Sequence, residues 1–419
     1  MHAVYISLGN IHKDIRQKRS AQTWLLCAKI PVSRFPNTVF TGSKTEQEAM
    51  PGILRQRLFH QCMKLVLQPM RTDRREYHIV PGPDGKLRLT MAILMAWIAD
   101  MEEQRVIAGV GNQSCPVCVT QKAEFECWHG SVLGYTARDP KLTLEELFQA
   151  HQRYPEASPF EYKKEVQERG GLGLSGSVEE PCWEGLPVAP NVFIVQDLLH
   201  GCYKFVWDHL AEWLSYSIGE KELDHRFKAQ PKLGFRTFTD GIAKISQATG
   251  REHKTYLRFI LPVITGCKGL DCRVIASVRI LVDYIYLAHY PVVSISELEA
   301  MEHLLANFHA NKQVFILNGS RGDKGHLNIP KLHALIHYVT NAYQLGVPGN
   351  FSTEIPESLH IQMCKEPYQS TNRCDYDRQI LNYLDIQDRL TLRALYEAFR
   401  EEKEVHPLSH SIIAQVTPW

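Results

Sequence analysis

The pattern of apolar and polar positions predicts strands in the first part of the chain and helices in most of the remainder. Short apolar runs rich in β-forming residues predict two antiparallel strands at Val4–Leu8 and Trp24–Ile30, joined by a basic connection. Apolar residues recur at helical spacing over Lys44–Met70, which predicts a helix. A Pro-Gly-Pro-Asp-Gly turn predicts a hairpin between Tyr77–Val80 and Leu87–Leu89.

The next stretch, Met91–Gln104 (MAILMAWIADMEEQ), has a short apolar run that ends at an acid. Such a run predicts a buried strand with Asp100 at its carboxyl end, and Val106–Val110 is a candidate for one more short strand. Asp100 has two interpretations. It is either the water-facing end of a strand or helix, or a metal-binding carboxylate at the mouth of an α/β sheet, where ligands collect.

From about Leu142 onward the pattern becomes mainly helical. Gly170–Ser177 (GGLGLSGS) predicts a flexible joint, and Val274–Tyr290, apolar nearly all round, predicts the centre of a helical layer. The other predicted helices are Leu142–Gln152, Phe160–Glu168, Phe235–Ser246, Tyr256–Ile264, Ile295–Lys312, Pro330–Leu345 and Asp385–Arg400.

Composition fits a globular protein with no strong electrostatic preference for a partner. The 419 residues are 44% hydrophobic and 22% charged, and the net charge is +1, so DNA contacts would depend on local basic patches. Lys13–Arg19 and Arg71–Arg75 are such patches, with solvated loops as the alternative. Eleven cysteines without a signal peptide predict a reducing compartment. No apolar run is long enough to predict a membrane span.

Cys115-Pro-Val-Cys118 is followed by Cys127-Trp-His129, a group that could bind zinc. Thiolates and imidazoles suit tetrahedral zinc, although this spacing is not a standard zinc-finger spacing. A buried thiol pair is the alternative. A thioredoxin-like redox role is disfavoured because no βαβ pattern surrounds the CxxC.

Two later segments carry further candidate groups. His333 and His337 are four residues apart on a predicted helix, either as a metal pair or as histidines of a core or a helix surface. Glu354, Glu357 and His360 lie in FSTEIPESLHIQMCK, where the acids could equally serve the first turn of a helix.

The order of these segments resembles the Plavaka-type DNA transposases, a DDE family abundant in fungi. The resemblance rests on segments that span nearly the whole chain in one order: YISLGNIHKDIRQK, LRLTMAILMAWIADMEEQ, SCPVC, DLLHGCYKFVWDHL, ELDHRF with GFRTFTDGIAKISQATGREH, HLNIPKLHALIHYV and ESLHIQMCKEPYQSTNR.

The resemblance implies an α/β plus α protein, with an incomplete RNase H-like core interrupted by a large, mostly helical insertion. Residues 1–130 would hold the partial core and the CxxC segment, residues 131–345 the insertion, and residues 346–419 the helix that completes the core together with a tail. The implied chemistry is DNA transposition, in which carboxylates hold two Mg²⁺ or Mn²⁺ ions that cleave and transfer phosphodiesters.

The same resemblance assigns roles to individual residues. Asp100 would be the second catalytic carboxylate, and Glu357, rather than Glu354, the third. Asp197 and His200 match a DxxH motif that lies between those acids and orients substrate or braces the insertion. The implied partner is DNA, at transposon ends and target, in the nucleus, with a homo-oligomer left open.

One departure from the family pattern concerns the first catalytic acid. In the family it lies on a strand just before the segment matched by YISLGN, and this sequence starts at that segment. We therefore expect no strand transfer from this chain, since Asp14 lies in a connection rather than at a strand end. The alternatives are a non-catalytic DNA- or protein-binding remnant of a domesticated transposase and a small zinc-binding structural domain at Cys115–His129.

Overall fold

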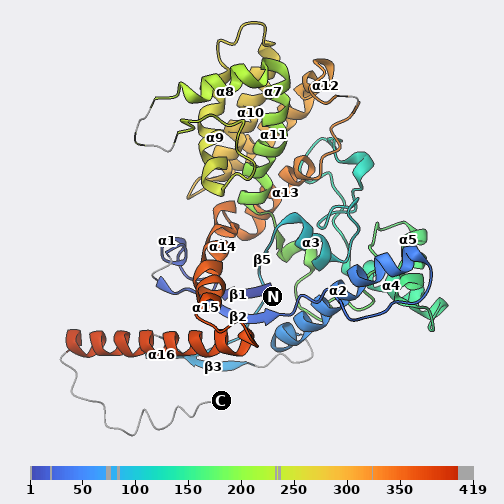
Figure 1. Ribbon diagram of the computed structural model, residues 1–419, viewed down its shortest axis with the longest axis vertical. Helices are drawn as coiled ribbons and strands as arrows, with labels where there is room; N and C mark the ends of the chain where they lie inside the picture. Colours follow the sequence, from blue (N-terminus) through green and yellow to red (C-terminus); the bar gives the residue numbers. More distant parts are fainter. Residues whose placement is uncertain are drawn as a thin grey trace.

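The computed structural model describes residues 2–18, 21–71, 77–82, 85–231, 234, 237–322 and 324–403. A helical part, built mainly from residues 206–345, lies above a part that holds short strands and further helices (Figure 1). The described residues form three two-stranded sheets. The predicted mixture of α/β and α structure is therefore confirmed, whereas the RNase H-like core and its insertion remain predictions.

The predicted N-terminal strand pair is present. Strand β1 (His2–Ser7) pairs antiparallel with β2 (Trp24–Ile30). Their connection holds α1 (Lys13–Arg16), whose Arg16 is buried and donates a hydrogen bond to the carbonyl of Gly9 at 3.2 Å. Arg16 therefore points into the protein and is not part of a basic surface. Arg19 and residues 72–75, which belong to the two predicted basic patches, lie outside the described residues.

The predicted first long helix and hairpin are also present. Helix α2 (Lys44–Leu67) is capped by Ser43, whose hydroxyl accepts a hydrogen bond from the amide of Glu46 at 3.2 Å. Strand β3 (His78–Pro81) pairs antiparallel with β4 (Leu87–Thr90), while residues 83–84 of the predicted turn lie outside the described range.

The stretch before Asp100 forms less strand than its apolar pattern predicts. Only β5 (Trp97–Ile98) pairs, and it pairs in parallel with β6 (Ile194–Val195), which follows the short helix α6 (Pro190–Phe193). The prediction of a strand at 106–110 is wrong, because α3 (Met101–Ala108) covers most of that range. Asp100 caps the start of α3, and Gly109 ends the helix in the left-handed conformation. These two capping residues explain why the segment is a helix and not a strand.

The glycine-rich segment 170–177 is packed, not the flexible joint that its composition predicts. It follows α4 (Pro140–Arg153) and α5 (Pro159–Arg169), and residues 174–177 are buried. Gly176 has a φ of +68°, and a Cβ there would come within 2.6 Å of the carbonyl oxygen of Lys163. Glycine is needed at this position for its backbone conformation and for close approach to α5.

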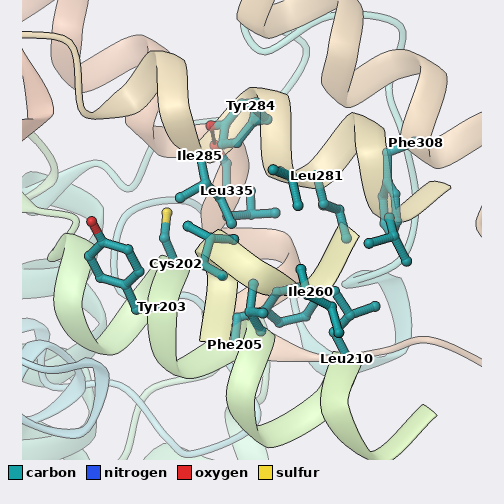
Figure 2. Packing of buried hydrophobic residues seen from close by; sticks show 14 of the residues in the cluster. Cys202, Tyr203, Phe205, Leu210, Ile260, Leu281, Tyr284, Ile285, Phe308 and Leu335 are labelled. Carbon is teal, nitrogen blue, oxygen red and sulfur yellow. Dashed lines mark hydrogen bonds between the residues drawn. The ribbon is translucent and has the colours of Figure 1, made fainter. Parts of the chain in front are cut away.

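The helical part is built on a continuous apolar core. Helix α10 (Cys272–Ala288) lies against its neighbours α9 (Gly250–Ile264) and α11 (Ile295–Asn311), as its apolar sequence predicts. Figure 2 shows Ile260, Leu281 and Leu335 from three helices meeting in that core. The predicted helix at 235–246 is wrong for its described residues, 237–246, which form turns and loops. The elements of this part are η6 (Val206–Leu210), α7 (Ala211–Ile218), α8 (Glu220–Lys228), α9 (Gly250–Ile264), α10 (Cys272–Ala288), α11 (Ile295–Asn311), α12 (Val314–Leu317) and α13 (Pro330–Leu345).

The chain then returns to the strand-bearing part. The returning segment contains η7 (Pro348–Phe351), α14 (Glu354–His360), η8 (Ile361–Lys365), α15 (Glu366–Gln369) and the long α16 (Tyr376–Lys403), which runs along the bottom of Figure 1. Across the described ranges, no helix combines the length and apolarity that crossing a bilayer requires.

Candidate functional site

Two of the predicted acidic residues lie at one edge of the β5–β6 pair. The parallel pairing joins Trp97 to Ile194 and Ile98 to Val195. Asp100 and Asp197 each follow two residues after the last paired position of their strand, so both lie beyond the carboxyl ends of adjacent strands. In open α/β sheets, ligands bind at this end of the strands.

A buried glutamine holds the two strand ends together. The side-chain amide of Gln104 donates hydrogen bonds to the carbonyls of Ala99 at 2.8 Å and Val195 at 3.0 Å. Its carbonyl accepts from the side chain of Gln196 at 3.4 Å. Gln104 lies in α3, so the helix that follows β5 also fixes the end of β6.

The carboxylate of Asp100 lies at the surface and is partly committed to the backbone. It caps α3 by accepting a hydrogen bond from the amide of Glu103 at 2.9 Å. Asp100 is therefore a water-facing residue at the start of a helix, as one of its two interpretations predicts. The side chain is exposed, so its carboxylate also remains accessible to a ligand.

Asp197 has the opposite environment, because it is 2% exposed and surrounded by donors. Its oxygens accept from the amides of Leu199 at 3.1 Å and His200 at 2.9 Å. They also accept from the amide of Thr353 at 2.9 Å and from its hydroxyl at 2.8 Å. Because its oxygens accept all these hydrogen bonds, the carboxylate holds η5 (Leu198–Tyr203) against the segment that leads into α14.

His200 connects Asp197 to the exposed acid of α14. Its Nδ1 lies 2.6 Å from Asp197 Oδ2 and its Nε2 lies 3.1 Å from Glu357 Oε1. Burial alone would lower the pKa of His200, but the hydrogen bonds to Asp197 and Glu357 outweigh it and raise the pKa to about 10. At neutral pH the side chain is therefore an imidazolium that donates to a carboxylate at each end.

The family resemblance favours Glu357 over Glu354 as a site residue, and the two glutamates have different partners. The side chain of Glu357 is 52% exposed and pairs with His200. Glu354 pairs with Lys254 of α9, at 2.6 Å. Thr353 was noticed in the sequence only as a helix-start signal. Its hydroxyl makes no cap to α14 and instead reaches Asp197.

The predicted acids have the oxygen ligands that a divalent metal prefers, but they do not form a complete coordination site. Asp100 and Glu357 offer accessible carboxylate oxygens, the ligands that Mg²⁺ and Mn²⁺ prefer. Asp197 is already occupied by hydrogen bonds. Among the described residues, the only group of three or more potential ligands close enough to share one ion is made of cysteines and histidines.

That group consists of Cys115, Cys118, His333 and His337, all four of them buried. The CxxC loop follows α3, and the histidines lie one turn apart on α13. Their ligand atoms all lie within 4.8 Å of one another. Two of the predicted zinc ligands are therefore in this cluster. The other two, Cys127 and His129, lie outside it and are exposed.

The contacts on His129 fit its position outside the cluster. Its ring lies edge-on to Tyr135, with the two ring centroids 4.7 Å apart. The spacing of four between His333 and His337 was a usable signal in the sequence. The partners of the two histidines had no such signal, because nothing in the sequence shows that a loop more than 200 residues earlier packs against this helix.

A helix–loop contact connects the cluster to the carboxylate edge. In α13, the side chain of Asn341 accepts a hydrogen bond from the amide of Gln196 at 3.2 Å, and the hydroxyl of Tyr338 donates to the carbonyl of Asp197. One helix thus holds both the two histidines and the backbone that leads into η5.

Comparison with known proteins identifies the family. A family model described as Plavaka transposase matches residues 1–214, just over half of the 419 residues. The matched segment contains the β5–β6 edge, the CxxC loop and the Asp197–His200 pair. No curated protein matches the chain. The chain belongs to the Plavaka transposase family.

Proposed function

We propose that this protein acts on DNA as a transposase-family enzyme, with Asp100 and Glu357 as two of the carboxylates that hold a divalent ion. The sequence led us to expect no strand transfer from this chain, and the cleavage assay below tests that expectation together with the proposal. The observation that carries the proposal is the hydrogen-bonded series Asp197–His200–Glu357 at the strand edge where Asp100 lies. It links the accessible glutamate of α14 to the loop after β6, although the two are about 160 residues apart in the sequence.

Each side chain has a distinct role in this proposal. Asp197 is a positioning residue, because its oxygens are taken by backbone and side-chain donors. It fixes the ring of His200, and the imidazolium in turn fixes the carboxylate of Glu357. A bound Mg²⁺ or Mn²⁺ would supply Lewis-acid stabilisation of the phosphodiester during cleavage and strand transfer.

The family match supports DNA as the substrate, and we expect the protein to act in the nucleus. The polynucleotide would approach the strand edge, where Asp100 is exposed. Lys331 lies near this edge: burial lowers the pKa of Lys331, and the negative charge of Asp100 opposes that shift. Lys331 pairs with Asp208 at 2.6 Å, so the surroundings of the edge contain cationic as well as acidic groups.

A metal-dependent nicking assay on duplex DNA tests the proposal. With Mn²⁺, we expect Asp100→Asn and Glu357→Gln to lower cleavage by about 100-fold each, because each removes one charged ligand at the reacting centre. Glu354→Gln is the matched control, since it removes a carboxylate one turn earlier on the same helix. That carboxylate pairs with Lys254, so the variant should retain cleavage within a few-fold.

His200→Gln separates positioning from chemistry in the same assay. The glutamine side chain can still donate a hydrogen bond to Glu357 but lacks the positive charge of the imidazolium. Cleavage should therefore fall less than in Glu357→Gln. Equal loss in Glu354→Gln and Glu357→Gln would contradict the assignment. A wild-type chain that binds DNA in EDTA and never cuts it with Mg²⁺ or Mn²⁺ would contradict the enzymatic proposal.

The alternative is a protein that binds DNA or another protein without catalysis, and one feature of the fold favours it. Helix α16 runs for 28 residues and exposes several large apolar side chains along its length: Leu381, Ile386, Leu390, Leu392, Leu395 and Tyr396. Large apolar groups gathered on a surface commonly mark an interaction site. This function predicts complexes that form equally well with and without divalent ions.

A further inference from the structure

We propose that Cys115, Cys118, His333 and His337 bind one structural zinc ion, which joins the CxxC loop to helix α13. The proposal concerns a site away from the acids of the strand edge and does not depend on the enzymatic proposal above. It also replaces Cys127 and His129, the partners suggested by sequence spacing, with two histidines far along the chain.

The separations of the donor atoms match a tetrahedral zinc centre. Cys115 Sγ lies 3.3 Å from His337 Nε2, and Cys118 Sγ lies 3.1 Å from His333 Nε2. Zinc–sulfur bonds of about 2.3 Å and zinc–nitrogen bonds of about 2.0 Å in a tetrahedron place sulfur and nitrogen roughly 3.5 Å apart. These two separations need to open by only a few tenths of an ångström, and the other separations within the group are at most 4.8 Å.

The residue types fit zinc better than other cations. Two thiolates and two imidazoles form a closed Cys₂His₂ set, which is typical of structural zinc and leaves no position open for water. Mg²⁺ and Ca²⁺ prefer oxygen ligands, which this cluster lacks. Two thiolates also neutralise the charge of the ion, so a buried centre carries no net charge from its ligand set.

The loop around the CxxC provides each sulfur atom with a hydrogen-bonding neighbour. The amide of Val117 donates to Cys115 Sγ at 3.4 Å. Cys118 Sγ and the hydroxyl of Thr120 are 3.2 Å apart, in hydrogen-bonding range. Hydrogen bonds from neighbours commonly orient metal ligands in this way.

An aromatic shell covers the histidine side of the cluster. Phe125 stacks on the ring of His333 with centroids 5.1 Å apart, and Tyr135 meets that ring edge-on at 5.4 Å. All four ligand side chains are at most 4% exposed. A redox role for the CxxC requires thiols that partner proteins can reach, whereas these thiols are enclosed.

Metal content is the direct test. The full chain, produced without a polyhistidine tag in zinc-supplemented medium, should contain one zinc per chain by inductively coupled plasma mass spectrometry. Cys118→Ser and His333→Ala should each lose most of that zinc. Cys127→Ser and His129→Ala are matched controls, because they change the same residue types close by, and both should retain it.

A spectroscopic measurement covers the case in which the ligand variants fail to fold. X-ray absorption at the zinc edge of the wild-type chain should report two sulfur and two nitrogen neighbours, at about 2.3 Å and 2.0 Å. His337→Cys keeps a zinc-binding ligand and should shift the count to three sulfur atoms. A wild-type chain that holds no zinc after refolding in its presence overturns the proposal. So does zinc that is lost only in Cys127→Ser or His129→Ala.

The outcome is separable from that of the DNA-cleavage assay. Zinc content is read without DNA, and Asp100 and Glu357 are not ligands of this cluster. A chain with one zinc and no nicking activity would support the zinc site and count against the enzyme. A chain that nicks DNA but contains no zinc would support the enzyme and count against the zinc site.

Discussion

At the scale of single residues, the charge of Asp197 is matched by donors from two distant segments. Its own loop supplies the amides of Leu199 and His200 and the imidazolium, and the segment before α14 supplies both donors of Thr353. A buried carboxylate without such partners would be strongly destabilising. The same set of contacts brings Glu357 to the strand edge, so fold stability and site geometry depend on the same few atoms.

The raised pKa of His200 predicts a loss of stability at alkaline pH. The unfolded-state pKa is near 6.5 and the folded pKa is about 10. The imidazolium contribution is therefore complete below about pH 6.5 and is lost as the pH rises through 10. We expect the free energy of unfolding from urea titrations to fall between pH 7 and 10, by on the order of 3 kcal/mol.

Two variants test whether His200 causes the fall in the free energy of unfolding between pH 7 and 10. His200→Gln should flatten the alkaline decline. His209→Gln should leave it unchanged, because burial lowers the pKa of His209 to about 4 and that ring is neutral over the whole range. If the His200→Gln protein loses stability with pH as steeply as the wild type, the imidazolium is not the cause.

At the scale of elements, short segments depend on contacts that their own sequences do not reveal. Residues 170–177 have the composition of a linker, yet they pack against α5 and bridge to Val110 through Leu174. Gly176 permits this packing because it has a positive φ and no side chain. The segment is thus part of the core below the helical part.

Gly176→Ala should lower the free energy of unfolding by about 2 kcal/mol, because it adds both backbone strain and a contact with Lys163. Chemical denaturation of both proteins measures the difference. Gly171→Ala is the matched control, since its added Cβ meets nothing within 4 Å, and it should change stability by less than about 0.5 kcal/mol. Similar losses in the two variants would indicate a general effect of the segment's flexibility.

The sequence was informative where structure is decided locally. Periodic helices and the first strand pair could be read from it. The roles of Asp100, Asp197, His200 and Glu357 came from the family resemblance and remain predictions. It was misleading where a helix cap or a distant contact determines the local structure. Asp100 caps a helix over residues 101–108, part of which was predicted as a strand. The helix predicted at 235–246 is absent from the described residues of that range. The partners of the CxxC depend on tertiary packing, which periodicity does not encode.

At the scale of the whole molecule, the Cys–His cluster lies where two apolar cores meet. Cys115 and Cys118 belong to the core of the strand-bearing part, and α13 contributes Leu332 and Leu335 to the core of the helical part. Tyr135 packs against both cores. A metal at this junction would restrain the two parts relative to each other.

If the zinc proposal holds, removing the ion should uncouple the two cores. Native-state hydrogen exchange should show α3 and the CxxC loop losing protection in EDTA, while α10 remains protected, because α10 is buried against α9 and α11. The ion closes a loop of 215 residues between Cys118 and His333, a restraint worth on the order of 5 kcal/mol in chain-entropy models. Equal loss of protection in both regions would show one cooperative unit instead.

The distance along the chain between the cysteines and the histidines also has a consequence during synthesis. Translation at about 5 to 20 residues per second means that Cys118 leaves the ribosome roughly 10 to 40 seconds before His333, which follows it by 215 residues. Through that interval the nascent chain carries a pair of thiols whose partners do not yet exist. If the zinc proposal holds, newly made chains would be open to oxidation of these thiols, or to capture of the metal by other ligands, until α13 is complete.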